Sequence, residues 1–180
     1  MNKVIITLLC ICSSAICFSQ QTYTPADEGS KVHFIIKNFA IKTGGDFKGM
    51  KGIINFDPLK LPTSNFTVTV EAATIDTDSE MRDDHLKEDD YFGVAKYPSI
   101  SVKSTKITKS SSAGRYYMFA NLTIKGITKP VELGFSAMPK DGGYFFEGEF
   151  EINRRDFNVG DKSISLQDKV KISLKVLAKN

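Results

Sequence analysis

An acidic stretch near the middle of the chain contains the residue types best suited to chemistry. From 83 to 90 the sequence reads DDHLKEDD, so carboxylates flank His85 on both sides. Carboxylates beside an imidazole are the usual components of a metal site or of an acid–base pair. The chain has two histidines, and the other, His33, lies in an alternating segment where it is expected on the outer surface. Imidazole chemistry would therefore depend on His85.

The spacing around His85 argues against both kinds of reactive site. A metal site of Asp84, His85 and Glu88 would need converging ligands, but successive residues on a helix point in different directions, and no second histidine follows four positions later. Acid–base catalysis, with Asp83 or Asp84 assisting His85, would describe a hydrolase or isomerase. The sequence has no Gly-x-Ser-x-Gly nucleophile elbow to support it. We therefore predict no metal, no cofactor and no catalytic residue, and keep the hydrolase or isomerase with His85 as base as an alternative.

The element that carries this stretch is predicted to be a short helical segment at about 78–92. Thr77 and Glu80 have the spacing of a capping box, in which each residue's side chain binds an orphan amide of the other. Met81 and His85 share one face of such a helix. We expect the apolar residues of this segment to cap one end of the protein, while its acids face water.

The first nineteen residues are predicted to be a cleaved signal peptide. Lys3 supplies a positive charge, a short apolar run follows, and small residues precede Gln20. Lipid attachment at Cys17 is the alternative, which the bulky Ile16 disfavours. We therefore expect a periplasmic or secreted protein in which residues 20–180 form one domain.

The composition narrows the class of this domain. All three cysteines lie in the signal, so neither disulfides nor thiol chemistry are expected in the mature chain. The formal charge of +3, which falls by one when Lys3 is removed, is too small to indicate a nucleic-acid partner. No later segment is apolar for long enough to span a membrane. The sequence leaves open whether the protein is a monomer or a homodimer.

Alternation of apolar and polar residues dominates the rest of the chain and predicts an all-β protein. Phe66, Val68 and Val70, each followed by a polar residue, are typical of a half-buried antiparallel strand. Turn residues separate such segments, among them Gly44-Gly45, which we interpret as a turn. The strands are expected at 31–39, 46–57, 65–75, 98–107, 114–125, 128–138, 143–154 and 168–178.

A sheet of eight antiparallel strands with one apolar face can close into a barrel, which removes its exposed edges. We predict a single barrel, with a sandwich as the main rival. The interior of such a barrel is either filled by side chains or holds one small ligand. Small residues beside phenylalanines at inward positions favour a hollow, and a solid core in a protein used for surface interactions is the alternative.

Arg154 is a further polar residue with two interpretations. The alternation of the strand 143–154 places it inward after Ile152, near one end of the interior. If the strand ends earlier, Arg154 instead pairs with a surface carboxylate. The sequence does not decide between the two.

Four groups of residues, in this order and spacing, resemble the YceI-like family of exported bacterial proteins. They are Ile75-Asp76-Thr77 with Arg82-Asp83-Asp84-His85-Leu86, Lys96-Tyr97-Pro98 with Ile100 to Ser104, Leu122 to Val131, and Ile152-Asn153-Arg154-Arg155-Asp156-Phe157. The resemblance extends from about Tyr23 to Ala178.

The resemblance implies a lipocalin-like barrel that has a long apolar cavity and is not an enzyme. Members of the family bind polyisoprenoids or other long-chain amphiphiles, including isoprenoid quinones, so the partner expected here is a long-chain lipid. Asn38 departs from the family, in which many members carry His there, and no role is carried over to it. We expect Arg82, His85 and Arg154 as head-group candidates. The apolar lining is expected from Val32, Phe34, Ile36, Phe66, Val68, Val70, Ile100, Val102, Met118, Leu122, Phe146 and Phe150.

The function predicted on this basis is the binding, sequestration or transport of a long-chain amphiphile in the cell envelope. An apolar tail is insoluble in water, and a lining without directional contacts suits a tail of variable length.

Overall fold

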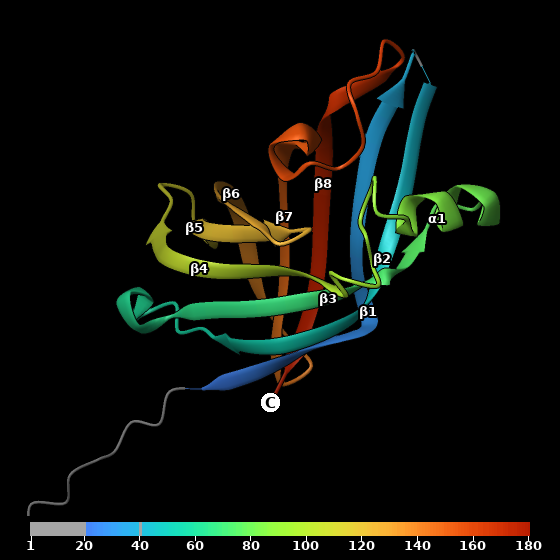
Figure 1. Cartoon of the computed structure of the whole chain (residues 1–180). Helices are drawn as coiled ribbons and strands as arrows, with labels where there is room; N and C mark the ends of the chain where they lie inside the picture. Colours follow the sequence, from blue (N-terminus) through green and yellow to red (C-terminus); the bar gives the residue numbers. More distant parts are fainter. Residues whose placement is uncertain (1–20, 40) are drawn as a thin grey trace, which may run out of the picture.

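The computed structural model describes residues 21–39 and 41–180, and these residues form an eight-stranded antiparallel barrel (Figure 1). The strands follow one another around the barrel in sequence order, and β8 pairs with β1 to close it. The predicted all-β barrel is thereby confirmed, whereas the predicted signal peptide at 1–19 lies outside the described residues.

The elements are β1 Thr22–Asn38, β2 Ile41–Asn55, the 3-10 helix η1 Leu61–Thr63, β3 Asn65–Asp76, α1 Glu80–Lys87, β4 Ser99–Lys109, β5 Arg115–Ile124, β6 Ile127–Lys140, β7 Gly143–Asn153, the 3-10 helix η2 Arg154–Phe157 and β8 Leu166–Lys179.

The predicted turn at Gly44-Gly45 is wrong, because both glycines lie inside β2, opposite Ile35 and Phe34. Their lack of a side chain makes room for rings of the neighbouring strand. A Cβ atom on Gly45 would lie 2.7 Å from the ring of Phe34, and one on Gly44 would lie 2.9 Å from the ring of His33. A glycine inside a strand often marks such a close approach rather than a turn. The chain reverses instead next to Phe39, whose φ is 53°.

One end of the barrel, where β1 begins and β8 ends, is filled by aromatic side chains. Phe56, only 1% exposed, lies at the centre of this aromatic floor. Its ring contacts five others edge-on, at centroid distances between 5.1 and 6.2 Å, an arrangement that favours the ring quadrupoles. These partners are Phe66, Tyr116, Phe135, Tyr144 and Phe146. Burial raises the pKa values of Tyr144 and of the adjacent Tyr23 above the usual value for tyrosine, because a phenolate would lose its hydration there.

The alternation of inward and outward side chains in β2 is interrupted part-way along the strand. Phe47 and Met50 are both buried inside the barrel although they are three residues apart. The reason is an irregularity in the pairing of β2 with β3 around Lys48 and Gly49, where Gly49 has a φ of 72°. The carboxylate of Asp27 accepts hydrogen bonds from the backbone N–H groups of Gly49 and Met50 and so holds this bulge.

The predicted helical segment between β3 and β4 is present, and its regular helix α1 spans Glu80–Lys87. Helix α1 ends at Lys87, and the chain then turns so that Tyr91 and Phe92 approach the barrel interior. Leu86 also faces inward. Met81 was expected on the covered face of the helix as well, but it is 87% exposed. In the part of the chain that the structure describes, no helix has the length and hydropathy needed to cross a membrane.

Candidate ligand-binding cavity

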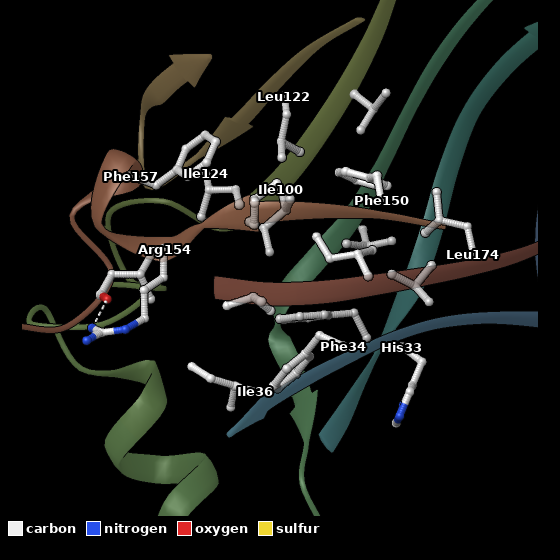
Figure 2. A pocket seen from close by; sticks show the side chains of 18 of the residues that line it. His33, Phe34, Ile36, Ile100, Leu122, Ile124, Phe150, Arg154, Phe157 and Leu174 are labelled. Atoms are coloured by element: carbon white, nitrogen blue, oxygen red, sulfur yellow. Dashed lines mark hydrogen bonds between the residues drawn. The ribbon is translucent and has the colours of Figure 1, made fainter. Parts of the chain in front are cut away.

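Beyond the aromatic floor, the barrel encloses a cavity of about 410 Å³. This volume lies within the range of pockets that hold a small-molecule ligand. All twelve residues predicted to form the apolar lining do line it. Figure 2 shows Phe34, Ile36, Ile100, Leu122, Phe150 and Leu174 directed into the same space. Their position is therefore established, while their contact with a ligand stays a prediction.

The exposed fractions of inward side chains separate the solid part of the barrel from the hollow part. Ile54 and Phe56 in the floor region are each 1% exposed. Val68, Val102 and Leu174 also point inward but are only half-buried, because they border empty space rather than other side chains. Bulky residues fill the floor end of the barrel and leave the cavity open beyond it, which contradicts the alternative of a solid core.

Arg82 and His85 lie at the mouth of the cavity, at the end opposite the floor, and both are exposed. The Arg82 Nε donates to Thr77 Oγ1 at 2.8 Å, and its Nη2 donates to the Thr77 carbonyl at 2.6 Å. His85 Nδ1 lies 3.1 Å from a carboxylate oxygen of Glu88, and its ring meets that of Tyr91 edge-on at 4.8 Å. Arg82 is thus held in place at the mouth. Its role toward a head group stays a prediction, as does that of His85.

His33 was expected on the outer surface, and its side chain points away from the other residues around the cavity (Figure 2). Its Nδ1 lies 2.6 Å from Asp46 Oδ1, and the other carboxylate oxygen of Asp46 lies 3.1 Å from the Nζ of Lys31. Among the described residues, no group of three or more His, Cys, Asp or Glu side chains is arranged to hold a metal ion. Neither histidine therefore belongs to a metal-binding cluster in that part of the chain.

Arg154 combines both interpretations left open by the sequence. Strand β7 ends before it, yet its side chain is only 4% exposed and lies at the edge of the cavity (Figure 2). The guanidinium donates to the backbone carbonyls of Val159, Asp161 and Gln167 at 2.8, 2.9 and 3.2 Å. It also lies 2.8 Å from a carboxylate oxygen of Asp168. These contacts indicate that Arg154 holds the segment between η2 and β8, and a head-group role for it stays a prediction.

Asp83 is the buried acid of the stretch DDHLKEDD and ties α1 to the end of β3. Its carboxylate accepts hydrogen bonds from the N–H group of Thr77, at 2.9 Å, and from the Thr77 hydroxyl. The predicted capping box would have used Thr77 with Glu80, but the structure uses Asp83 in place of Glu80. Leu86 on the same helix is thereby held against the cavity. Helix α1 therefore acts as a tethered cover over part of the lining.

Replacing Asp83 by alanine is expected to loosen this cover. Loss of a buried acceptor that binds two donors costs about 1–3 kcal/mol. We expect faster amide hydrogen exchange in α1, measured by mass spectrometry of peptides that cover it. Asp84→Ala is the matched control, because Asp84 is exposed and forms an ion pair with Lys87 of the same helix rather than with the barrel. Equal exchange in both variants would show that the tether is unimportant.

The sequence-based list omitted a large part of the lining. The whole inner face of β8 was left out, although its alternation is visible in the sequence. Phe47 and Met50 were missed because a simple alternation cannot be carried through the bulge at Gly49. The contributions of the α1 segment depend on tertiary packing. The omitted lining residues include Phe47, Met50, Leu86, Tyr91, Phe92, Val170, Ile172, Leu174 and Val176.

Comparison with known proteins shows which family the chain belongs to. The model of the YceI-like domain matches residues 23–178. The chain belongs to the YceI-like family. A UPF0312 protein of Photorhabdus laumondii is 38% identical to this YceI-like chain over 120 residues, which are 63% of this chain and 62% of the relative. The match thus spans slightly less than two thirds of that relative's length.

Solved structures share the YceI-like barrel. Burkholderia cenocepacia BcnA is 26% identical, with a TM-score of 0.81, and the match covers 87% of this chain and 99% of BcnA. A domain from Saccharophagus degradans, described as a polyisoprenoid binding domain implicated in plant cell wall breakdown, has a TM-score of 0.67 at 11% identity. That match covers 87% of this chain and 97% of the domain, and at this identity it shows a common fold alone.

Proposed function

We propose that this protein binds one long-chain apolar amphiphile, of the polyisoprenoid or isoprenoid-quinone kind, and carries or sequesters it without chemical change. The observation that carries the proposal is the cavity of about 410 Å³, which apolar side chains line from the aromatic floor to the mouth. The polyisoprenoid binding domain of similar fold supports it.

The energetics favour an apolar chain over a polar ligand. Each CH₂ group transferred from water to the cavity contributes about 0.8 kcal/mol. A polar group would lose its hydration without gaining hydrogen-bond partners along most of the lining. We place the chain of the ligand between the phenylalanines of the lining, and its head group at the mouth near Arg82 and His85.

The setting that suits this function is the cell envelope. The first nineteen residues have the features of an export signal, and we propose that the protein works after export, in the periplasm or outside the cell. An apolar chain is insoluble in either compartment, so transfer through water requires a binding protein of this kind.

Extraction of the native protein tests the proposal. The chain, expressed with its own signal and purified without detergent, should release an amphiphile on treatment with organic solvent, identified by mass spectrometry. After removal of that ligand, the protein should bind a fluorescent polyisoprenoid analogue. Absence of a ligand together with failure to bind the analogue would contradict the proposal.

The hydrolase or isomerase alternative makes a different prediction for the same material. Under that alternative, His85→Ala would abolish the turnover of a bound amphiphile while its occupancy remained. Under the binding function, the native protein returns the extracted ligand chemically unchanged after incubation.

A further inference from the structure

Three large apolar side chains protrude at the mouth end of the barrel. Phe39 is 73% exposed, Ile41 is 72% exposed and Ile164 is fully exposed. Phe39 and Ile41 lie where β1 turns into β2, and Ile164 lies in the segment that precedes β8. We call these three side chains the apolar tip.

The structure holds the two segments of the apolar tip together. The N–H group of Phe39 donates to the carbonyl of Ser165 at 2.6 Å. Asn38 pairs with Ile41 on one side and with Leu166 on the other. Figure 1 shows the β1–β2 hairpin and the orange-red segment before β8 reaching the same end of the molecule, beyond α1. The apolar tip is therefore one feature formed by both segments.

The apolar tip adjoins the entrance to the cavity. Asn38 and Leu166, which flank it, both belong to the residues that line the cavity. Any partner that covers the apolar tip therefore also faces the mouth.

The charges around the apolar tip are mainly positive. Lys37, Lys42 and Lys162 are all exposed beside it, and residues 36–43 contain no acid. Asp161 lies next to Lys162, but its carboxylate is 3.6 Å from the guanidinium of Arg155. Helix α1, which carries Glu80, Asp83 and Asp84, is set back from the tip (Figure 1). Apolar side chains ringed by lysines are typical of segments that enter the headgroup region of anionic membranes.

We propose that the apolar tip docks reversibly on an anionic phospholipid bilayer and so places the mouth of the cavity at the membrane surface. The proposal rests on the proposed function for the identity of the cargo, which would enter or leave through that mouth. Three projecting side chains are few for a protein partner, because a stable interface uses roughly 20–30 residues a side. A fluid bilayer needs no complementary surface, so a small convex tip suits it.

Vesicle co-sedimentation tests the docking. The protein should bind vesicles of phosphatidylcholine with phosphatidylglycerol, and the triple variant Phe39→Asn, Ile41→Thr, Ile164→Asn should bind them at least about tenfold more weakly. Asparagine tolerates the positive φ of Phe39. Leu59→Asn is the matched control, because Leu59 is 91% exposed but lies near η1, away from the tip. It should bind like the parent.

The charge contribution is measured separately. Replacement of Lys37, Lys42 and Lys162 by glutamine should weaken binding to vesicles that contain phosphatidylglycerol by at least about tenfold, and added salt should also weaken binding of the parent. Binding to vesicles of phosphatidylcholine alone should be the same for this variant and the parent.

Two further measurements separate docking from cargo binding and from self-association. The apolar-tip variant should bind the fluorescent polyisoprenoid analogue in solution as the parent does, so failure of the parent to bind it would count against the proposed function only. Equal vesicle binding by the parent and the apolar-tip variant would overturn the docking proposal. A parent dimer that the apolar-tip variant converts to a monomer in gel filtration would also overturn it, because a second copy would then cover the tip.

Discussion

Replacing Leu174 by tryptophan is expected to abolish tight binding of an apolar chain while the protein stays folded. Leu174 points into the hollow part of the barrel from the middle of β8, where it lies opposite Val32 and Gly148 (Figure 2). A larger ring there would occupy space that the ligand needs. If it displaces about four CH₂ groups at about 0.8 kcal/mol each, the affinity falls by more than about a hundredfold. Titration with the fluorescent polyisoprenoid analogue measures this loss.

The matched control for Leu174→Trp is Lys175→Trp, one residue further along β8. The side chain of Lys175 is 56% exposed and points outward, where it pairs with Glu147 at 3.4 Å. The same ring on the outer face should leave the affinity unchanged. Extra bulk in a packed core typically costs 1–3 kcal/mol, but at Leu174 the void should absorb part of that strain. If both variants bind like the parent, the cavity is not the ligand site.

Replacing Arg154 by methionine is expected to cause a large loss of stability. The substitution removes a buried cation, leaves the carbonyls of Val159 and Asp161 without their donor and leaves the carboxylate of Asp168 without its counter-ion. Breaking a buried ion pair in this way typically costs about 3–5 kcal/mol. The free energy of unfolding, measured with urea, should fall by about this amount, towards the lower limit because Asp168 is 44% exposed.

The neighbouring arginine provides the control for Arg154→Met. Arg155 is 37% exposed and donates one hydrogen bond, of 2.7 Å, to the carbonyl of Gly160. Arg155→Met should therefore cost about 1 kcal/mol or less. A head-group role for Arg154 predicts the opposite pattern for Arg154→Met, in which stability is retained and the affinity for the amphiphile falls.

The inner face of most strands could be predicted from the sequence, because the alternation of side chains in a strand is a local property with a period of two. Val68, Val102 and Leu122 were placed inward on this basis, and each lines the cavity. The same rule fails at Gly49, where one bulge reverses the parity of β2 between Phe47 and Met50.

The behaviour of the polar residues could be predicted less well. Thr77 was identified as a cap, but its partner is Asp83 rather than Glu80, because the chain turns at Asp78 with a φ of 60°. For Arg154 the sequence left two interpretations open, an inward position and a surface ion pair. The carbonyls that accept its hydrogen bonds come from residues 5 to 13 positions later, on a segment whose path no local pattern indicates.

The sequence by itself determined the eight strands, the inward faces of most of them, the family resemblance and the absence of cysteine from the part of the chain after residue 17. Only the tertiary structure decided that the barrel is solid at the aromatic floor and hollow above it. A cavity is the difference between the volume that eight strands enclose and the volume of all the side chains that point inward. That difference depends on closure of the barrel, on the bulge in β2 and on where Phe56 meets its five aromatic neighbours, and none of these is a local property of the sequence.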